Sequence, residues 1–125
     1  ASEIKNVVLK IRQCRIIYQM ITLIESPLFT KLWPDYWTEE ERGEFSVWLA
    51  ENPEVGDVVP GSGGIRKVRW ARKGQGKRGG MRVIYFTESA KGLIWLLTIY
   101  AKSKKENVPA HILKALKEEL IDGYE

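Results

Sequence analysis

The fold is decided by the stretch IRKVRWARKGQGKRGGMRVIYFTESAKGLIWLLTIY, residues 65–100, which contains three consecutive strand patterns. These patterns cover 65–71, 81–87 and 93–100, and each is rich in β-branched and aromatic residues. The links between them, at 72–80 and 89–92, are short enough for antiparallel hairpins. The last pattern is apolar almost throughout, which predicts a central strand covered on both faces.

The sequence before these strands contains a well-marked helix. Thr38 is followed three positions later by a glutamate, which is the spacing of a capping box at a helix start. Phe45, Trp48 and Leu49 then recur at intervals of three and four residues, the period of a helix with one apolar face. We expect a helix from Thr38 to about residue 51.

The remaining elements complete an α+β pattern. They are a strand at 21–25, a short helix at 27–32 and a C-terminal helix that begins after Pro109. The order strand, helices, three strands, helix is typical of helices packed against a mainly antiparallel sheet. We therefore predict the α+β class, with a mainly antiparallel twisted sheet and helices packed on it in one compact domain.

The beginning of the chain is the part that the patterns assign least clearly. Residues 1–19 show no firm period of 2 or 3.6, so an extra strand, an extra helix and a segment outside the native domain all stay open. Met20 stands directly before the first clear strand and is a candidate start residue. We expect an N-terminal extension at 1–19 and a folded domain at 20–125.

A single cysteine and a single histidine limit the available chemistry. Cys14 excludes an intrachain disulfide and favours a reducing, cytoplasmic setting, and together with His111 it is too little for a zinc site. The glycine-rich stretches lack the Walker A spacing of a phosphate-binding loop. The longest apolar run, 93–100, is far below the ~20 residues of a membrane span, and no secretory signal pattern opens the chain. We expect a cytoplasmic protein that uses no metal or cofactor and binds no membrane.

Positive charge is concentrated in one segment. Eight of the 20 Lys and Arg residues lie between positions 66 and 82, where there is no acid, and the rest of the chain has 12 basic against 16 acidic residues. The eight are Arg66, Lys67, Arg69, Arg72, Lys73, Lys77, Arg78 and Arg82. A focused positive field attracts polyanions, and Lys and Arg contacts to phosphate dominate nucleic-acid affinity. The segment therefore predicts a nucleic-acid-binding surface, and the alternative is a solvated basic hairpin with no specific partner.

The first strand of this segment sorts its side chains by alternation. Lys67 and Arg69 lie on one face, and Val68 and Trp70 on the other, toward the core. The first face is then open, and Arg82 from the next strand can join the two cations. Cations around one phosphate stabilise a doubly charged transition state and help a neighbouring lysine to lose its proton. Because RNA supplies its own 2′-hydroxyl nucleophile, such a face can cleave RNA without a metal or a histidine pair.

These residues carry a family resemblance. ENPEVGDVVPGSGGIRKVRWARKGQGKRGGMRVIYF at 51–86 and LLTIYAKSKKE at 96–106 closely resemble the HigB-type branch of the RelE-like toxins of bacterial toxin–antitoxin systems. The resemblance extends from about Met20 to the C-terminus. It implies an mRNA interferase, a small α+β toxin that enters the ribosomal A site and cuts the mRNA there through the 2′-hydroxyl without a metal. It also implies a cognate antitoxin, commonly with a helix-turn-helix domain, and binding of operator DNA only by the toxin–antitoxin complex.

The resemblance also implies roles for individual residues. Lys67 would act as the base, and Arg69 and Arg82 would stabilise the phosphate. Binding of RNA or the ribosome would fall to Arg66, Arg72, Lys73, Lys77, Arg78 and Lys102. Tyr85 has two interpretations, stacking on a base or packing in the core.

Two departures from the RelE prototype leave the general acid unassigned. Ser103 stands where that pattern has an arginine, and Val108 where it has a tyrosine. Two rival functions also stay open: a non-catalytic module that docks on the ribosome or on nucleic acid, and a protein that only binds the antitoxin. Sequence does not separate them, because a cation that positions a phosphate and one that stabilises its transition state are the same residue type.

Overall fold

The computed structural model describes residues 3–12, 16–71, 80–101 and 109–124 of the chain. The strands are β1 (Glu3–Arg12), β2 (Ile16–Glu25), β3 (Asp57–Val58), β4 (Arg66–Trp70), β5 (Met81–Glu88) and β6 (Leu93–Ala101). The helices are α1 (Pro27–Leu32), α2 (Glu39–Glu51) and α3 (Ala110–Tyr124), with 3-10 turns at Trp33–Asp35 and Ser89–Lys91. Within these described parts the strands form one six-stranded sheet in the order β1-β2-β6-β5-β4-β3.

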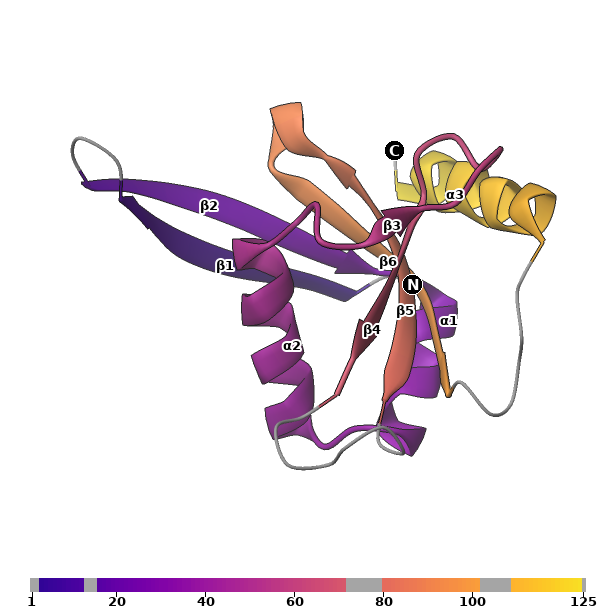
Figure 1. Cartoon of the computed structure of the whole chain (residues 1–125), viewed down its shortest axis with the longest axis horizontal. Helices are drawn as coiled ribbons and strands as arrows, with labels where there is room; N and C mark the ends of the chain where they lie inside the picture. The colour runs from indigo at the N-terminus through magenta and orange to yellow at the C-terminus, as the bar shows by residue number, and fades with distance from the viewer. Residues whose placement is uncertain (1–2, 13–15, 72–79, 102–108, 125) are drawn as a thin grey trace.

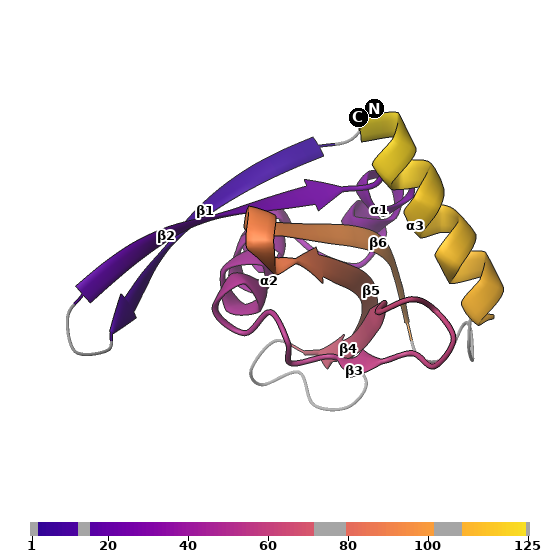
Figure 2. The same ribbon diagram turned by 90° about the horizontal axis from the view of Figure 1, so that it is seen from above.

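The sheet confirms the predicted α+β class and its mainly antiparallel character (Figure 1). Among the described strands one pair is parallel, β2 with β6, and its register covers residues 22–25 of β2. The rest of the β1–β2 hairpin projects away from the other strands (Figures 1 and 2). Of the alternatives left open for the start of the chain, the structure therefore shows an extra strand at 3–12. The strand predicted at 21–25 is present but begins earlier, at Ile16.

Helices cover both faces of the sheet (Figure 2). α1 and α2 pack on one face through Phe29, Phe45 and Leu49, all fully buried. α3 packs on the other face through Leu113 and Leu120. β6 lies between β2 and β5 and is buried along almost its whole length, as its apolar sequence predicts.

Three aromatic rings join α2 to the sheet. The ring of Trp70 on β4 lies 5.4 Å from that of Trp37 and 5.6 Å from that of Phe45, both in edge-on contacts. Such pairs contribute about 0.5–1.5 kcal/mol beyond the burial of their area. The predicted capping box is present: the Thr38 hydroxyl accepts from the backbone N–H of Glu41, whose carboxylate accepts from the Thr38 N–H.

A buried ion pair fixes α2 to the end of β2. Arg42 Nε and Nη2 donate to the two carboxylate oxygens of Glu25 at 2.8 and 2.7 Å, and both side chains are almost fully buried. The guanidinium also lies over the ring of Trp33, 4.5 Å from its centroid. The next residue, Ser26, caps α1 and donates its hydroxyl hydrogen to the carbonyl of Leu97 on β6 at 2.6 Å. β2, β6, α1 and α2 are thus held together at one point.

Two side chains from β4 and β5 hold the loop that precedes β3. The Tyr85 hydroxyl donates to the carbonyl of Pro53 and accepts from the N–H of Gly56, both at 2.9 Å. Arg66, directly opposite Tyr85 in the sheet, donates to the carbonyls of Glu54 and Gly56 at 3.1 and 2.8 Å. A Cβ atom at Gly56 would lie 2.8 Å from the Tyr85 hydroxyl oxygen, so the close approach requires glycine. The short strand β3 follows directly after this contact, at Asp57–Val58.

We predict that Arg42→Leu lowers the free energy of unfolding by about 3 kcal/mol or more, because it leaves the Glu25 carboxylate buried without its guanidinium. Urea denaturation of wild type and variant measures the loss. Adding Glu25→Leu should recover most of the stability, since a buried pair can be replaced by apolar side chains of similar volume. A loss below 1 kcal/mol in Arg42→Leu would contradict this account of the contact.

Tyr85→Phe should lower the free energy of unfolding by about 1–2 kcal/mol at pH 7, because the Gly56 N–H and the Pro53 carbonyl both lose a partner. Burial raises the pKa of Tyr85 above its ordinary value of 10.0, an effect that the Gly56 hydrogen bond and the Arg66 charge partly oppose. The unfolded phenol therefore ionises first as the pH rises above about 10, and the wild type loses stability that the variant never had. Urea denaturation at pH 7 and pH 11 should show a smaller difference at pH 11.

Candidate active site

The cross-strand register brings four polar side chains together on the α3 face of the sheet. Arg69 on β4 lies opposite Arg82 on β5, and Arg82 lies opposite Tyr100 on β6. Directly opposed residues share a face, with Cβ atoms about 5 Å apart. Lys67, two residues before Arg69, lies on that face as well. The predicted grouping of Lys67, Arg69 and Arg82 is therefore what the pairing produces, and Val68 and Trp70 pack on the other face as expected.

The exposure of these cations differs. Arg69 is exposed, whereas Lys67 and Arg82 are half-buried. Asp57 on β3 lies directly opposite Lys67 and is exposed. The acid-free segment of the sequence thus acquires one carboxylate from a neighbouring strand, which sequence reasoning missed because β3 is only two residues long.

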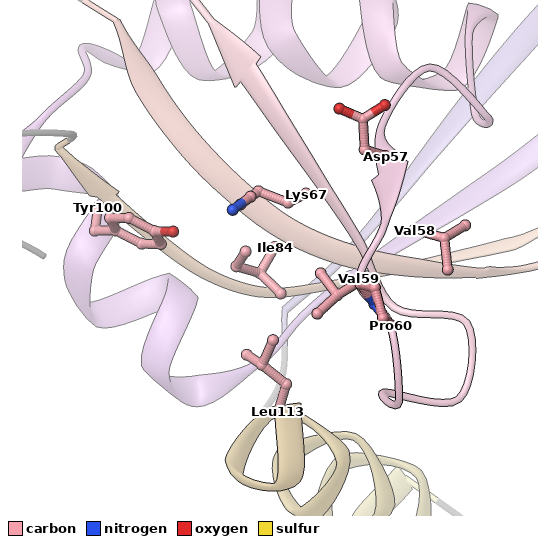
Figure 3. A pocket seen from close by; sticks show the side chains of 8 residues that line it. All are labelled: Asp57, Val58, Val59, Pro60, Lys67, Ile84, Tyr100 and Leu113. Atoms are coloured by element: carbon pink, nitrogen blue, oxygen red, sulfur yellow. The ribbon is translucent and has the colours of Figure 1, made fainter. Parts of the chain in front are cut away.

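Arg69 and Arg82, with Lys67 beside them, form what we call the basic row. A pocket of about 400 Å³ adjoins it (Figure 3). It is lined by Asp57, Val58, Val59, Pro60, Lys67, Ile84, Tyr100 and Leu113. Leu113 comes from α3, so the face that the sequence predicts to be open is covered by a helix at one end. The pocket combines apolar walls with a few convergent polar groups, which is the usual composition of a ligand site.

Tyr100 is, after Asp57, a second polar group of this pocket that sequence reasoning missed. Its side chain is only 5% exposed, and within the described part of the chain its hydroxyl has no hydrogen-bond partner. The hydroxyl and the Lys67 ammonium point toward one another (Figure 3). The strand pattern at 93–100 gave no sign of this role, because the residue closes an apolar run that reads as core.

The other predicted binding residues divide into two groups. Arg66 and Tyr85 lie on the opposite face from Lys67, where they hold the 53–56 loop. Tyr85 is fully buried, so of its two interpretations the structure supports packing in the core rather than stacking on a base. The remaining five lie outside the described residues: Arg72, Lys73, Lys77, Arg78 and Lys102.

The described residues also bear on two other classes of site, a metal centre and a membrane-spanning helix. No three or more His, Cys, Asp or Glu side chains in this part of the chain are grouped so that they could hold a metal ion. Among the described helices, none has the length and apolar character that crossing a membrane requires.

A comparison with protein families places this region. Residues 56–120 match the model of the RelE toxin of the RelE/RelB toxin–antitoxin system. The match covers just over half of the 125-residue chain, from the loop before β3 into α3, and so includes Lys67, Arg69, Arg82 and Tyr100. The chain therefore belongs to the RelE toxin family of toxin–antitoxin systems.

Proposed function

We propose that this toxin is a HigB-type mRNA interferase, an endoribonuclease that cuts mRNA on the ribosome. The observation that carries the proposal is the row of Arg69 and Arg82 across β4 and β5, with Lys67 beside it at the mouth of a pocket. Two arginines whose Cβ atoms lie about 5 Å apart can direct their guanidinium groups at both non-bridging oxygens of one phosphodiester.

The reaction uses the substrate's own 2′-hydroxyl as nucleophile. Lys67 accepts the hydroxyl proton, and the oxygen attacks the adjacent phosphorus. Arg69 and Arg82 stabilise the additional negative charge of the pentacoordinate phosphorus. The bond to the 5′-oxygen then breaks, which leaves a 2′,3′-cyclic phosphate on one fragment and a 5′-hydroxyl on the other. In this scheme side-chain cations supply the positive charge, and the reaction uses no metal.

The partners follow from the same surface. A toxin of this family has a cognate antitoxin. We propose a helix-turn-helix antitoxin whose acidic segment covers the basic row, because complementary charge favours this orientation. Operator DNA would be bound by the complex rather than by the toxin alone. The rival proposal is a module that docks on the ribosome through the same cations without cutting. Measurements of the cleavage rate of the bound protein distinguish the two proposals.

Lys67→Ala or Arg82→Ala should each slow single-turnover cleavage of ribosome-bound mRNA by at least ~100-fold, about 2.7 kcal/mol, because each removes a group that acts on the transition state. Ribosome affinity should change little. Primer extension on programmed ribosomes measures the rate, and Lys31→Ala, an exposed lysine on α1, is the control. If both variants cut at the wild-type rate once bound, the row is a docking surface.

Lys77→Ala should have the opposite signature, since Lys77 is assigned to binding. Ribosome binding should weaken, and the slope of log affinity against log salt should fall by roughly one phosphate contact. Cleavage at saturating protein should stay near the wild-type rate. Titrations at several salt concentrations test this, and a defect in the saturated rate with unchanged binding would refute the assignment.

A further inference from the structure

Tyr100 reaches the site because β6 breaks its alternation. Ile84 of β5 pairs with Thr98, but the following residue of β5 pairs with Leu96, so the register skips Leu97. Such a bulge shifts every later side chain to the other face. Bulges occur often beside active sites, where they redirect a side chain.

The two cores show the effect of the bulge on β6. Trp95 and Leu97 pack on the α3 face, and strict alternation would continue with Ile99 there. Instead Ile99 packs in the core under α1 and α2, and Tyr100 joins the α3 face opposite Arg82. Because of the bulge, Tyr100 rather than Ile99 lies on the α3 face, at the end of the basic row.

The hydroxyl of Tyr100 is unusual for a buried group. Buried polar atoms are nearly always hydrogen-bonded, and each exception requires an explanation. In the described part of the chain the Tyr100 hydroxyl has no partner, whereas the Tyr85 hydroxyl, also buried, has two. An apolar side chain would fill the same space without an unpaired hydroxyl, so packing alone does not account for a tyrosine here.

The placement of the groups suggests a task for this hydroxyl. In a displacement at phosphorus the entering and leaving oxygens lie roughly in line, so a base and an acid are needed on opposite sides of the phosphate. Lys67 lies on β4 and Tyr100 on β6, with Arg82 on β5 between them. The outer strands are about 10 Å apart. The two side chains point toward one another across this interval (Figure 3).

We propose that Tyr100 is the general acid of the cleavage reaction, an inference that rests on the proposed function. As the bond between phosphorus and the 5′-oxygen breaks, the phenol transfers its proton to that oxygen, which leaves as a neutral 5′-hydroxyl. The phenolate regains a proton from water, and the proton taken from the 2′-hydroxyl stays on Lys67 until it too is lost to water. In the complex with RNA, the phosphate bound by Arg82 supplies the hydrogen-bond partner that the Tyr100 hydroxyl lacks within the described part of the chain.

Tyr100→Phe tests the inference, with a chemical substitution in the RNA. Ribosomes are programmed with a short synthetic mRNA whose cut linkage, mapped first with wild type, carries either the natural 5′-oxygen or sulfur in its place. A thiolate leaves without a proton, because its pKa is far below that of an alcohol. Tyr100→Phe should cut the oxygen linkage at least ~100-fold more slowly than wild type and the sulfur linkage within about threefold of it. Folding should be intact, since no described hydrogen bond is removed.

Tyr85→Phe is the matched control, because it removes a buried phenol hydroxyl from the other face and should leave both cleavage rates near those of wild type. If Tyr100→Phe cuts the oxygen linkage at the wild-type rate, or is equally slow on both linkages, Tyr100 is not the acid. If wild type cuts no linkage of the mRNA in the mapping step, the proposed function itself fails, and the inference with it. Unfolding of Tyr100→Phe, followed by circular dichroism, would mean that the hydroxyl is structural and would overturn the inference.

Discussion

Backbone hydrogen bonds between β4, β5 and β6 are the constraint on which the candidate site depends. Because side chains alternate along a strand, a slip of β4 by one residue against β5 would move Lys67 and Arg69 to the other face and separate them from Arg82. The observed register places Arg69, Arg82 and Tyr100 in line across three strands. The pairing of the strands places these side chains next to one another before any substrate is bound, and this placement needs no direct contact among them.

The two cores maintain this register. On one face Val68, Val83 and Tyr85 pack under α1 and α2, and a shift of β4 or β5 would expose them. On the other face Ile84 and Leu113 belong to the second core and also line the pocket, so the same packing shapes the site. The Glu25–Arg42 pair supports the register indirectly. It joins α2 to the end of β2, and the next residue, Ser26, begins α1 and donates a hydrogen bond to the backbone of β6.

The sequence allowed prediction of local structure and of features that depend on one strand at a time. The strands at 65–100, the helix after Thr38 and the shared face of Lys67 and Arg69 follow from period and capping alone. The parallel pairing of β2 with β6 did not follow, because it joins segments about 70 residues apart. Tyr100 was missed for a related reason: its face is set by a bulge against β5, and strict alternation along β6 gives the wrong face.

The central claim is that the protein cleaves RNA through the substrate's own 2′-hydroxyl. The most direct measurement replaces the nucleotide on the 5′ side of the cut linkage by its 2′-deoxy counterpart in a synthetic mRNA on programmed ribosomes. Our account predicts that cleavage at this linkage disappears, whereas the same replacement one nucleotide downstream leaves it intact. Cleavage of the deoxy-substituted linkage at a rate comparable to that of the unmodified mRNA would contradict the account.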